Sequence, residues 1–320
     1  MLINNTLQMY LESRKGNVRE STIQSHTYRL RRWLEFCSEQ GIESAEDIEQ
    51  KHFDQFKVGR RDEDELSPAT LKGQMDTLRV YIQYLERVGA VKNGLSESVP
   101  SISLKLEDSR NERIVTDDEA HRILETLDRY HYATKLHAFF ILGWRSSARI
   151  SSLRALDLED FSPGEQYVYF RERDSTELKN GVLGERPVAL SEETTEVLSD
   201  YIKHHRIDNT DQFGREPFFS SNQGRVHRNT FRRWSYKLTC PAFRSLDTEC
   251  DGYHKNRKCD DAVSPHGIRR GSITYFLRNG LPEKVVSDRA NVSEKVLDKH
   301  YDKRSQMEKM EQRRDYLNNI

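Results

Sequence analysis

Apolar residues recur at helical spacing through the first ninety residues of the chain. Serines placed as N-caps predict three helices, beginning at Ser21, Ser44 and Ser67, and a shorter helix around Leu7 precedes them. One apolar stripe on the third helix contains Leu71, Met75, Leu78, Ile82 and Leu85. The pattern predicts a small all-helical bundle over residues 1–92.

The periodicity then fades over residues 93–112, which are rich in glycine, serine and proline and are expected to form a linker. It returns at Thr116, where Glu119 completes a capping box. An apolar helix is expected from His131 to about Trp144. Further helices are expected at 191–204, 228–238, 266–279, 282–288 and 293–301, and in a charged final segment.

Two short runs interrupt the helices with strand-forming residues. Residues 167–170 read Tyr-Val-Tyr-Phe, and residues 187–190 read Pro-Val-Ala-Leu. A polar turn that contains Lys179 and Gly181 separates them. The sequence therefore predicts a mainly α protein with a small β-sheet, in which the second domain spans residues 113–320.

Composition limits the class of protein further. Hydrophobic residues make up 35% and charged residues 32% of the 320 positions, which allows two modest cores beneath a heavily charged surface. The net charge is only −1, so a nucleic-acid partner would require positive charge gathered on one face. No apolar run is long enough to span a bilayer, and no secretory segment begins the chain. Four cysteines do not suggest a disulfide framework. We expect an intracellular, cytoplasmic protein.

Four separate segments of the second half carry residues suited to phosphate chemistry. Arg149 lies in Ala-Arg-Ile-Ser-Ser-Leu-Arg-Ala-Leu-Asp, and Lys179 lies in the predicted turn between the strands. His266-Gly-Ile-Arg269 follows, and Tyr301 lies near the end. In order and spacing these segments resemble the tyrosine recombinases, or phage integrase family. That family has an arginine, a hairpin lysine, a His-x-x-Arg pair and a C-terminal tyrosine. Leu153, Leu156 and Asp160 also match positions of the family's first motif.

The resemblance implies both a fold and an activity. Residues 1–92 would form the core-binding, SAM-like helical domain, and residues 113–320 would form an α+β catalytic domain, the two closing around DNA. The protein would be a site-specific DNA recombinase or integrase that forms a covalent 3′-phosphotyrosyl intermediate. It would recombine double-stranded attachment sites as a tetramer on DNA, associated with the nucleoid and without a membrane. It would need no ATP and no cofactor for catalysis.

The residue types fit this chemistry. Arginines bind the non-bridging oxygens of a phosphate through paired planar donors, a role assigned to Arg149 and Arg269. Tyr301 would attack phosphorus, with His266 as the base or hydrogen-bond partner of its hydroxyl. Lys179, on the hairpin, would donate a proton to the departing 5′-oxygen.

The sequence departs from the family pattern at three places. Ser147-Ala148 replaces Gly-Leu before the first arginine, and Ser152 replaces a glutamate. The family's His or Trp, nine residues before the tyrosine, is Val292, with Asn291 beside it, so that role is vacant or filled by another group. Arg145 is a rival for Arg149, and Arg270 is a rival for Arg269.

A second group of residues has the chemistry of metal ligands. Cys240, Cys250, His254 and Cys259 lie in a loop-like insertion before His266, and thiolates with imidazole suit tetrahedral zinc. Such a structural zinc would brace the loop that presents His266. The alternative is three unrelated cysteines in a surface loop.

Two alternatives to a recombinase remain at this stage. One is a DNA-binding protein of the same fold that has lost strand transfer, motivated by Val292. The other is a relaxing enzyme similar to type IB topoisomerases, which share the chemistry. The charged tail, residues 303–320, is expected either to dock on a neighbouring protomer or to remain solvated.

Overall fold

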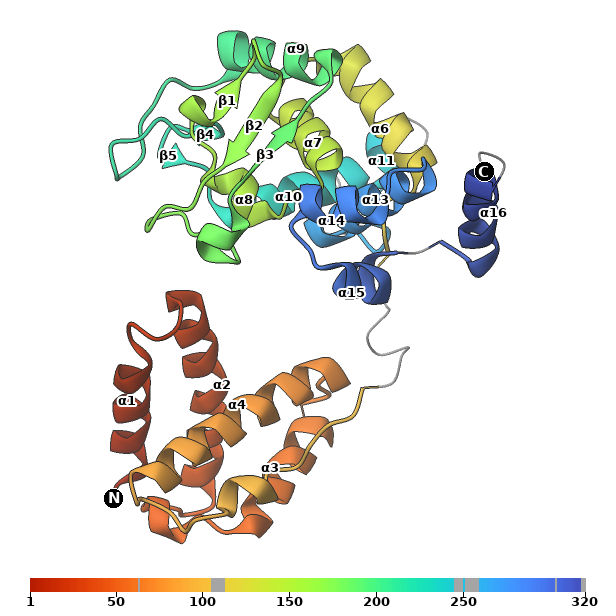
Figure 1. Ribbon diagram of the computed structural model, residues 1–320. Coiled ribbons are helices and arrows are strands. Elements are labelled where there is room, and N and C mark those ends of the chain that lie inside the picture. The colour runs from red at the N-terminus through yellow and green to blue at the C-terminus, as the bar shows by residue number, and fades with distance from the viewer. Residues whose placement is uncertain (63, 105–112, 245–249, 251–258, 303, 318–320) are drawn as a thin grey trace. The chain divides into compact units, whose positions relative to one another are not determined.

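The computed structural model describes residues 1–62, 64–104, 113–244, 250, 259–302 and 304–317. The chain divides into two compact units, Met1–Asn111 and Glu112–Ile320. Figure 1 shows a first unit made of helices and a second that adds two small sheets. Among the described residues, no helix is both long and apolar enough to cross a bilayer.

The described residues of the first unit form four α-helices, α1 (Ile3–Arg14), α2 (Glu20–Glu39), α3 (Gln50–Asp62) and α4 (Pro68–Arg87). Helix α4 begins where the sequence predicted, because the Ser67 hydroxyl accepts a hydrogen bond from the amide of Thr70 and Pro68 occupies the first turn. Around Ser44 the prediction was wrong. Ser44 caps only a short 3-10 turn, Ala45–Asp47, and α3 starts after it.

Aromatic side chains form the core of this helical unit. Trp33 of α2 is fully buried and contacts Phe53 and Phe56 of α3, with ring centroids 5.5 and 5.2 Å apart. Arg79 of α4 donates a hydrogen bond to the carbonyl group of Val99 (2.8 Å), which is itself buried. The chain therefore packs on the bundle well beyond α4, through another 3-10 turn, Leu95–Ser98.

The second unit contains the larger part of the helices. They are α6 (Asp117–Tyr130), α7 (Lys135–Ser146), α8 (Ile150–Ala155), α9 (Glu192–Asp200), α10 (Arg228–Thr239), α11 (Pro241–Arg244), α13 (Pro265–Arg278), α14 (Glu283–Ala290), α15 (Glu294–Val296) and α16 (Gln306–Leu317). Helix α7 packs against α6, α9, α10 and α13, which explains its continuous apolar sequence. The capping box at Thr116 and Glu119 is present at the start of α6.

Three expected helices of this unit are shorter or less regular than the sequence suggested. His131 ends α6 instead of starting α7, because Ala133 takes a left-handed conformation (φ 52°) in the turn between the two helices. Between Ser293 and Tyr301 the chain forms the single turn α15 and then a π-helical turn, Leu297–Tyr301. Helix α9 likewise ends in a π-helical turn, Tyr201–His205.

The predicted hairpin is present and belongs to a three-stranded antiparallel sheet. Strand β2 (Tyr167–Phe170) pairs with β3 (Arg186–Ala189), with Tyr167 opposite Ala189 and Phe170 opposite Arg186. Strand β1 (Phe161–Ser162), which the sequence did not predict, pairs with the other edge of β2. A second pair, β4 (Ser220–Ser221) and β5 (Gly224–Arg225), forms a separate small hairpin.

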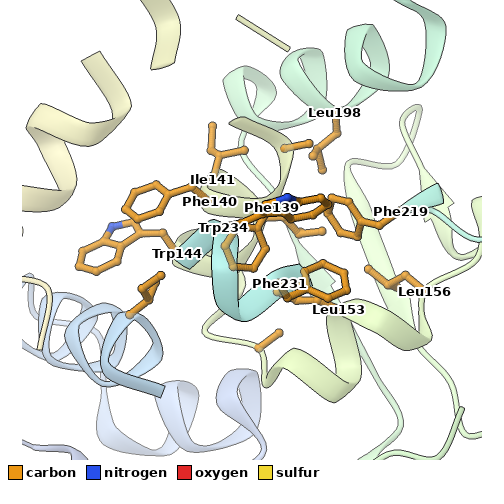
Figure 2. Packing of buried hydrophobic residues seen from close by; sticks show 14 of the residues in the cluster. Phe139, Phe140, Ile141, Trp144, Leu153, Leu156, Leu198, Phe219, Phe231 and Trp234 are labelled. Atoms are coloured by element: carbon orange, nitrogen blue, oxygen red, sulfur yellow. The ribbon is translucent and has the colours of Figure 1, made fainter. Parts of the chain in front are cut away.

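One hydrophobic core joins the helices and the sheet of the second unit. Figure 2 shows Phe139 of α7 among Phe219, Phe231 and Trp234, and the ring centroids of Phe139 and Phe231 are 5.5 Å apart. A smaller cluster near the end of the chain contains Val292, Leu297 and Tyr301. The segment from Val292 to Tyr301 thus packs on α13 and α14 through its own apolar residues.

Candidate active site

Arg149 is presented by a sharp turn between α7 and α8. Helix α7 ends at Ser146, and Ser147 takes a left-handed conformation with φ of 52°. The Ser147 hydroxyl lies 2.6 Å from the hydroxyl of Ser272 on α13, which ties the turn to that helix. Arg149 then occupies the N-cap position of α8, and its side chain makes no capping hydrogen bond there. The position of its side chain is therefore set by the packing of α7 against α13.

Helix α13 carries both His266 and Arg269. It starts at a capping serine, because the Ser264 hydroxyl accepts a hydrogen bond from the Gly267 amide. Gly271 is required by close packing, since a β-carbon there would collide with the main-chain carbonyl of Val115. The helix therefore lies against the chain just before α6, with Arg269 facing inward at 2% exposure.

Tyr301 lies beside these two side chains. The Arg269 guanidinium lies over its ring, with Cζ 5.3 Å from the centroid, and the His266 ring meets it edge-on at 5.5 Å. The Thr274 hydroxyl of α13 donates a hydrogen bond to the carbonyl of Tyr301 (3.0 Å), which fixes the π-helical turn against the helix. Tyr301 is 6% exposed, whereas His266 is exposed.

Arginine side chains from three different elements meet at the C-terminus of α14. They donate to three successive main-chain carbonyl groups: Arg186 Nε to Arg289 (2.8 Å), Arg269 Nη2 to Ala290 (2.8 Å) and Arg149 Nη1 to Asn291 (3.0 Å). The last carbonyl groups of a helix lack partners within the helix and carry partial negative charge. The three arginines therefore satisfy the carbonyl groups at the end of α14, and the same hydrogen bonds position the three cations.

These cations repel one another. Burial lowers the pKa of Arg186 to about 9, and the charges of Arg269, Arg149 and Arg289 act in the same direction. Burial and the charge of Arg149 lower the pKa of Arg269 to about 10, while the nearby Tyr301 hydroxyl acts in the opposite direction. In the described part of the chain none of Arg149, Arg186 and Arg269 forms an ion pair with a carboxylate. Such a cluster is suited to an anion.

Unused donors indicate where that anion would bind. Arg186 Nη2 and Arg269 Nε are both buried and make no hydrogen bond to any described residue. Buried donors of this kind are usually satisfied by a ligand or water. Other described arginines, such as Arg145, also have a buried Nε without a hydrogen bond, so the position of these two donors beside Tyr301 and Arg149 is what indicates an anion site. Arg186 was not singled out from the sequence; it directly precedes the predicted second strand, residues 187–190, and begins strand β3 in the structure.

Lys179 lies in the connection between β2 and β3 and is exposed. Its neighbours fix the connection on both sides: Leu178 is buried in the core, and Asn180 Nδ2 donates to Asn291 Oδ1 at 3.1 Å. The described residues show no contact between Lys179 and Tyr301. The structure thus brings Arg149, Arg269, His266 and Tyr301 together and leaves Lys179 at the edge of the group, one residue from a bond to Asn291.

Asp160, from the first motif, acts on the same connection. Its carboxylate accepts two hydrogen bonds from Arg173, at 2.9 and 2.8 Å, and one from the amide of Asp157. Arg173 comes shortly after β2, so this pair holds the start of the segment that carries Lys179. Asp160 is 2% exposed and is a positioning residue.

The two rival arginines are placed differently. The Arg145 guanidinium lies 3.8 Å from the carboxylate of Glu193, and the Arg145 carbonyl group accepts hydrogen bonds from Arg289. On α13 the guanidinium of Arg269 lies over the Tyr301 ring. Arg270, the next residue along the helix, is also buried.

At the position of the family's His or Trp this chain has a buried apolar residue, Val292. Val292 is 7% exposed and lies in the cluster that contains Leu297 and Tyr301. Asn291 precedes it in a left-handed conformation and ends α14. Asn291 contributes a carbonyl group to Arg149 and a side-chain oxygen to Asn180. An asparagine after a predicted helix is the sequence signal that would have indicated this cap.

The predicted metal ligands are partly described. The sulfur atoms of Cys240, Cys250 and Cys259 all lie within 4.8 Å of one another. His254 lies outside the described residues.

Comparison with known proteins relates this architecture to one family. Residues 113–305, more than half of the chain, match the profile described as "Phage integrase family", and residues 6–89 match "Phage integrase, N-terminal SAM-like domain". A probable integrase/recombinase protein, MJ0367, from Methanocaldococcus jannaschii is 22% identical over 87% of this chain and 79% of its own length. Tyrosine recombinase XerD from Halalkalibacterium halodurans is 21% identical over 89% of this chain and 88% of its own.

A solved structure shows the same fold. The Tn1549 transposon integrase, in complex with a circular intermediate DNA, superposes with a TM-score of 0.70 at 14% identity and covers 99% of both chains. The mainly helical architecture with its small sheet is therefore shared with this integrase.

Proposed function

Because the chain belongs to the phage integrase family, we propose that it is a site-specific DNA recombinase, a tyrosine recombinase with Tyr301 as its nucleophile. The observation that carries the assignment of residues is the meeting of Arg149, Arg269 and His266 around Tyr301. Its DNA-bound structural neighbour and the relatives named as recombinases support the same substrate class.

The arginines act on the phosphate. Attack on phosphorus adds negative charge to the non-bridging oxygens, and fixed cations in a partly buried site stabilise that charge without reorganisation. Arg269 and Arg149 are held by the main chain before DNA arrives. We assign Arg186 a supporting share of the same charge, since it donates to the carbonyl group of Arg289, next to the carbonyl groups that hold the other two arginines.

The covalent step exchanges one phosphoester for another. The Tyr301 oxygen forms a bond to phosphorus as the bond from phosphorus to the 5′-oxygen breaks. The phenolic proton passes to His266, whose ring lies edge-on to Tyr301. Lys179 donates a proton to the departing 5′-oxygen, which requires the β2–β3 connection to close over the site when DNA binds. The product is a 3′-phosphotyrosyl linkage and a free 5′-hydroxyl.

Strand exchange follows from the reversibility of this linkage. The phosphotyrosyl bond retains the energy of the phosphodiester, so attack by a 5′-hydroxyl from a second duplex reseals the DNA without ATP. Each of the two duplexes must be cut on both strands, which requires four tyrosines. We therefore propose a tetramer on a pair of double-stranded attachment sites, associated with the cell's own DNA in the cytoplasm.

Capture of covalent adducts from cells tests this function without choosing a target sequence in advance. Cells expressing a tagged protein are lysed in denaturant, the protein is recovered, and the DNA attached to it is sequenced. The proposal predicts a small set of junctions for the wild type and none for Tyr301→Phe. Background adducts at equal levels in both proteins would favour a DNA-binding protein without strand transfer. Adducts scattered without sequence preference would favour a relaxing enzyme.

A further inference from the structure

Three cysteines of the stretch between α10 and α13 meet outside the candidate active site. Cys240 ends α10, Cys250 follows α11, and Cys259 comes six residues before α13 begins at Pro265. Their sulfur atoms lie within 4.8 Å of one another, and Cys240 is buried. Three thiols from three separate segments share one small volume.

The spacing of the sulfur atoms differs from that of a disulfide. The Sγ atoms of Cys259 and Cys240 are 3.4 Å apart, whereas the bond in a disulfide is about 2.05 Å long. With zinc–sulfur bonds of about 2.3 Å, two thiolates on a tetrahedral ion lie roughly 3.8 Å apart. The sulfur–sulfur distances among the three cysteines are therefore compatible with one shared ion.

Hydrogen bonds join the two segments that carry Cys240 and Cys259. The Val263 amide donates to the Thr239 hydroxyl (2.8 Å), and the Ser235 hydroxyl donates to the Val263 carbonyl group (2.7 Å). These bonds join the last turn of α10 to the residues just before α13. Cys240 and Cys259, 19 positions apart, are thereby presented next to each other.

We propose that Cys240, Cys250 and Cys259 bind a structural zinc ion. Three soft thiolate ligands favour zinc over the hard cations magnesium and calcium, and a closed thiolate-rich set is typical of structural zinc. The fourth ligand comes from outside these three residues. The ion would join the end of α10 to the start of α13, the helix that carries His266 and Arg269.

The zinc content of the full-length protein tests this directly. The protein is purified under reducing conditions without chelator, and its metal is measured by elemental mass spectrometry. We expect about one zinc per chain, and a cobalt-substituted protein with thiolate-to-cobalt charge-transfer absorption. Serine variants of Cys240, Cys250 and Cys259 should each bind zinc at least tenfold more weakly. Cys37→Ser is the matched control, because Cys37 is buried in the helical unit and should leave the zinc content unchanged.

A second measurement keeps the proposal testable if a serine variant folds poorly. In the wild-type protein, a chelator should release the zinc and expose three further thiols to a thiol reagent, and it should lower the melting temperature. Zinc-free protein with the three thiols already reactive would overturn the proposal. So would a Cys240–Cys259 disulfide found in rapidly alkylated cells, or equal zinc loss in Cys37→Ser. None of these readouts depends on recombination, so the two proposals can fail separately.

Discussion

The guanidinium of Arg269 lies over the ring of Tyr301, with Cζ 5.3 Å from the ring centroid. Arg269 is held there by the carbonyl groups of Ser147 and Ala290 and is almost fully buried. The cation is therefore in place before any phosphate binds, which is the arrangement that makes electrostatic stabilisation of a transition state effective.

Replacement of Arg269 or Arg149 by lysine should slow DNA cleavage strongly. Lysine keeps the charge but loses the planar pair of donors, and loss of one fixed donor typically costs about 10²–10³ in rate. Single-turnover cleavage of a nicked site measures the effect. Arg145→Lys is the matched control, because Arg145 lies beside Glu193 and should stay within about threefold of wild type, a margin far below the 10²–10³ expected for a catalytic donor. A similar small loss for Arg269→Lys would remove it from the proposed machinery.

Phosphate should stabilise the protein through the arginine cluster. Burial, and then the neighbouring cations, lower the pKa of the Arg186 guanidinium in the folded chain, so at neutral pH the charged, buried cluster costs folding free energy. An anion that binds only the folded state at ten times its Kd returns about 1.4 kcal/mol, or about 3–6 °C in a unit of this size.

Thermal unfolding in phosphate and in chloride at equal ionic strength measures this gain. Arg186→Gln removes one cation and should lose at least half of the difference, whereas Arg129→Gln, on the exposed side of α6, should keep it. An equal shift in all three proteins would mean that phosphate acts on the protein as a whole.

Lys179→Ala should impair the departure of the 5′-oxygen. A general acid typically contributes about 10²–10⁴ in rate, so cleavage of ordinary DNA should slow by that order. Sulfur in place of the bridging 5′-oxygen leaves without a proton, and such a substrate should be cleaved by Lys179→Ala at nearly the wild-type rate. The exposed neighbour Glu177 provides the control variant Glu177→Gln. If the sulfur substrate did not restore the cleavage rate of Lys179→Ala, Lys179 would have a role other than that of a general acid.

His137 should make the protein sensitive to acid. It is fully buried, its Nδ1 accepts a hydrogen bond from the Ala133 amide (3.3 Å), and burial lowers its pKa to about 4. Near neutral pH the ring is uncharged in both states and contributes nothing. As the pH falls below about 6.5, His137 becomes protonated in the unfolded chain but stays neutral in the folded chain until about pH 4. This difference removes about 3 kcal/mol of stability over that pH range.

Denaturant unfolding at pH 7 and pH 4.5 measures the slope. His137→Gln keeps an acceptor for the Ala133 amide and cannot titrate, so its stability should fall less between the two pH values. Parallel slopes in the two proteins would show that other groups cause the acid sensitivity.

The sequence predicted the parts of the fold that depend on local patterns. The start of α4 at Ser67-Pro68 and the capping box at Thr116 and Glu119 are found as expected, as is the β2–β3 hairpin. The turn at Ala133 was missed because alanine carries no signal for a left-handed conformation. Strand β1 is only two residues long and has no periodicity to detect.

The arrangement of the site could be predicted only in part. Arg149, Arg269 and Tyr301 were predicted from the order of their motifs, and the structure brings them together; the contacts that hold the arginines involve main-chain carbonyl groups at the end of α14. Such groups leave no mark in a sequence. For the same reason nothing in the sequence distinguished Arg186, which lies just before the predicted strand 187–190, from the other arginines. Val292 was recognised as a departure, and the structure shows that its side chain packs beside Leu297.

Identification of the residue bound to DNA tests the central claim most directly. A nicked oligonucleotide of a captured site traps the covalent intermediate, and mass spectrometry of the digested adduct locates the linkage. Tyr301→Phe keeps the ring contacts with Arg269 and His266 and removes only the hydroxyl. We expect a phosphotyrosyl bond at Tyr301 in the wild type and no adduct in the variant. An adduct at another residue, or one that persists in Tyr301→Phe, would contradict the assignment of Tyr301 as the nucleophile.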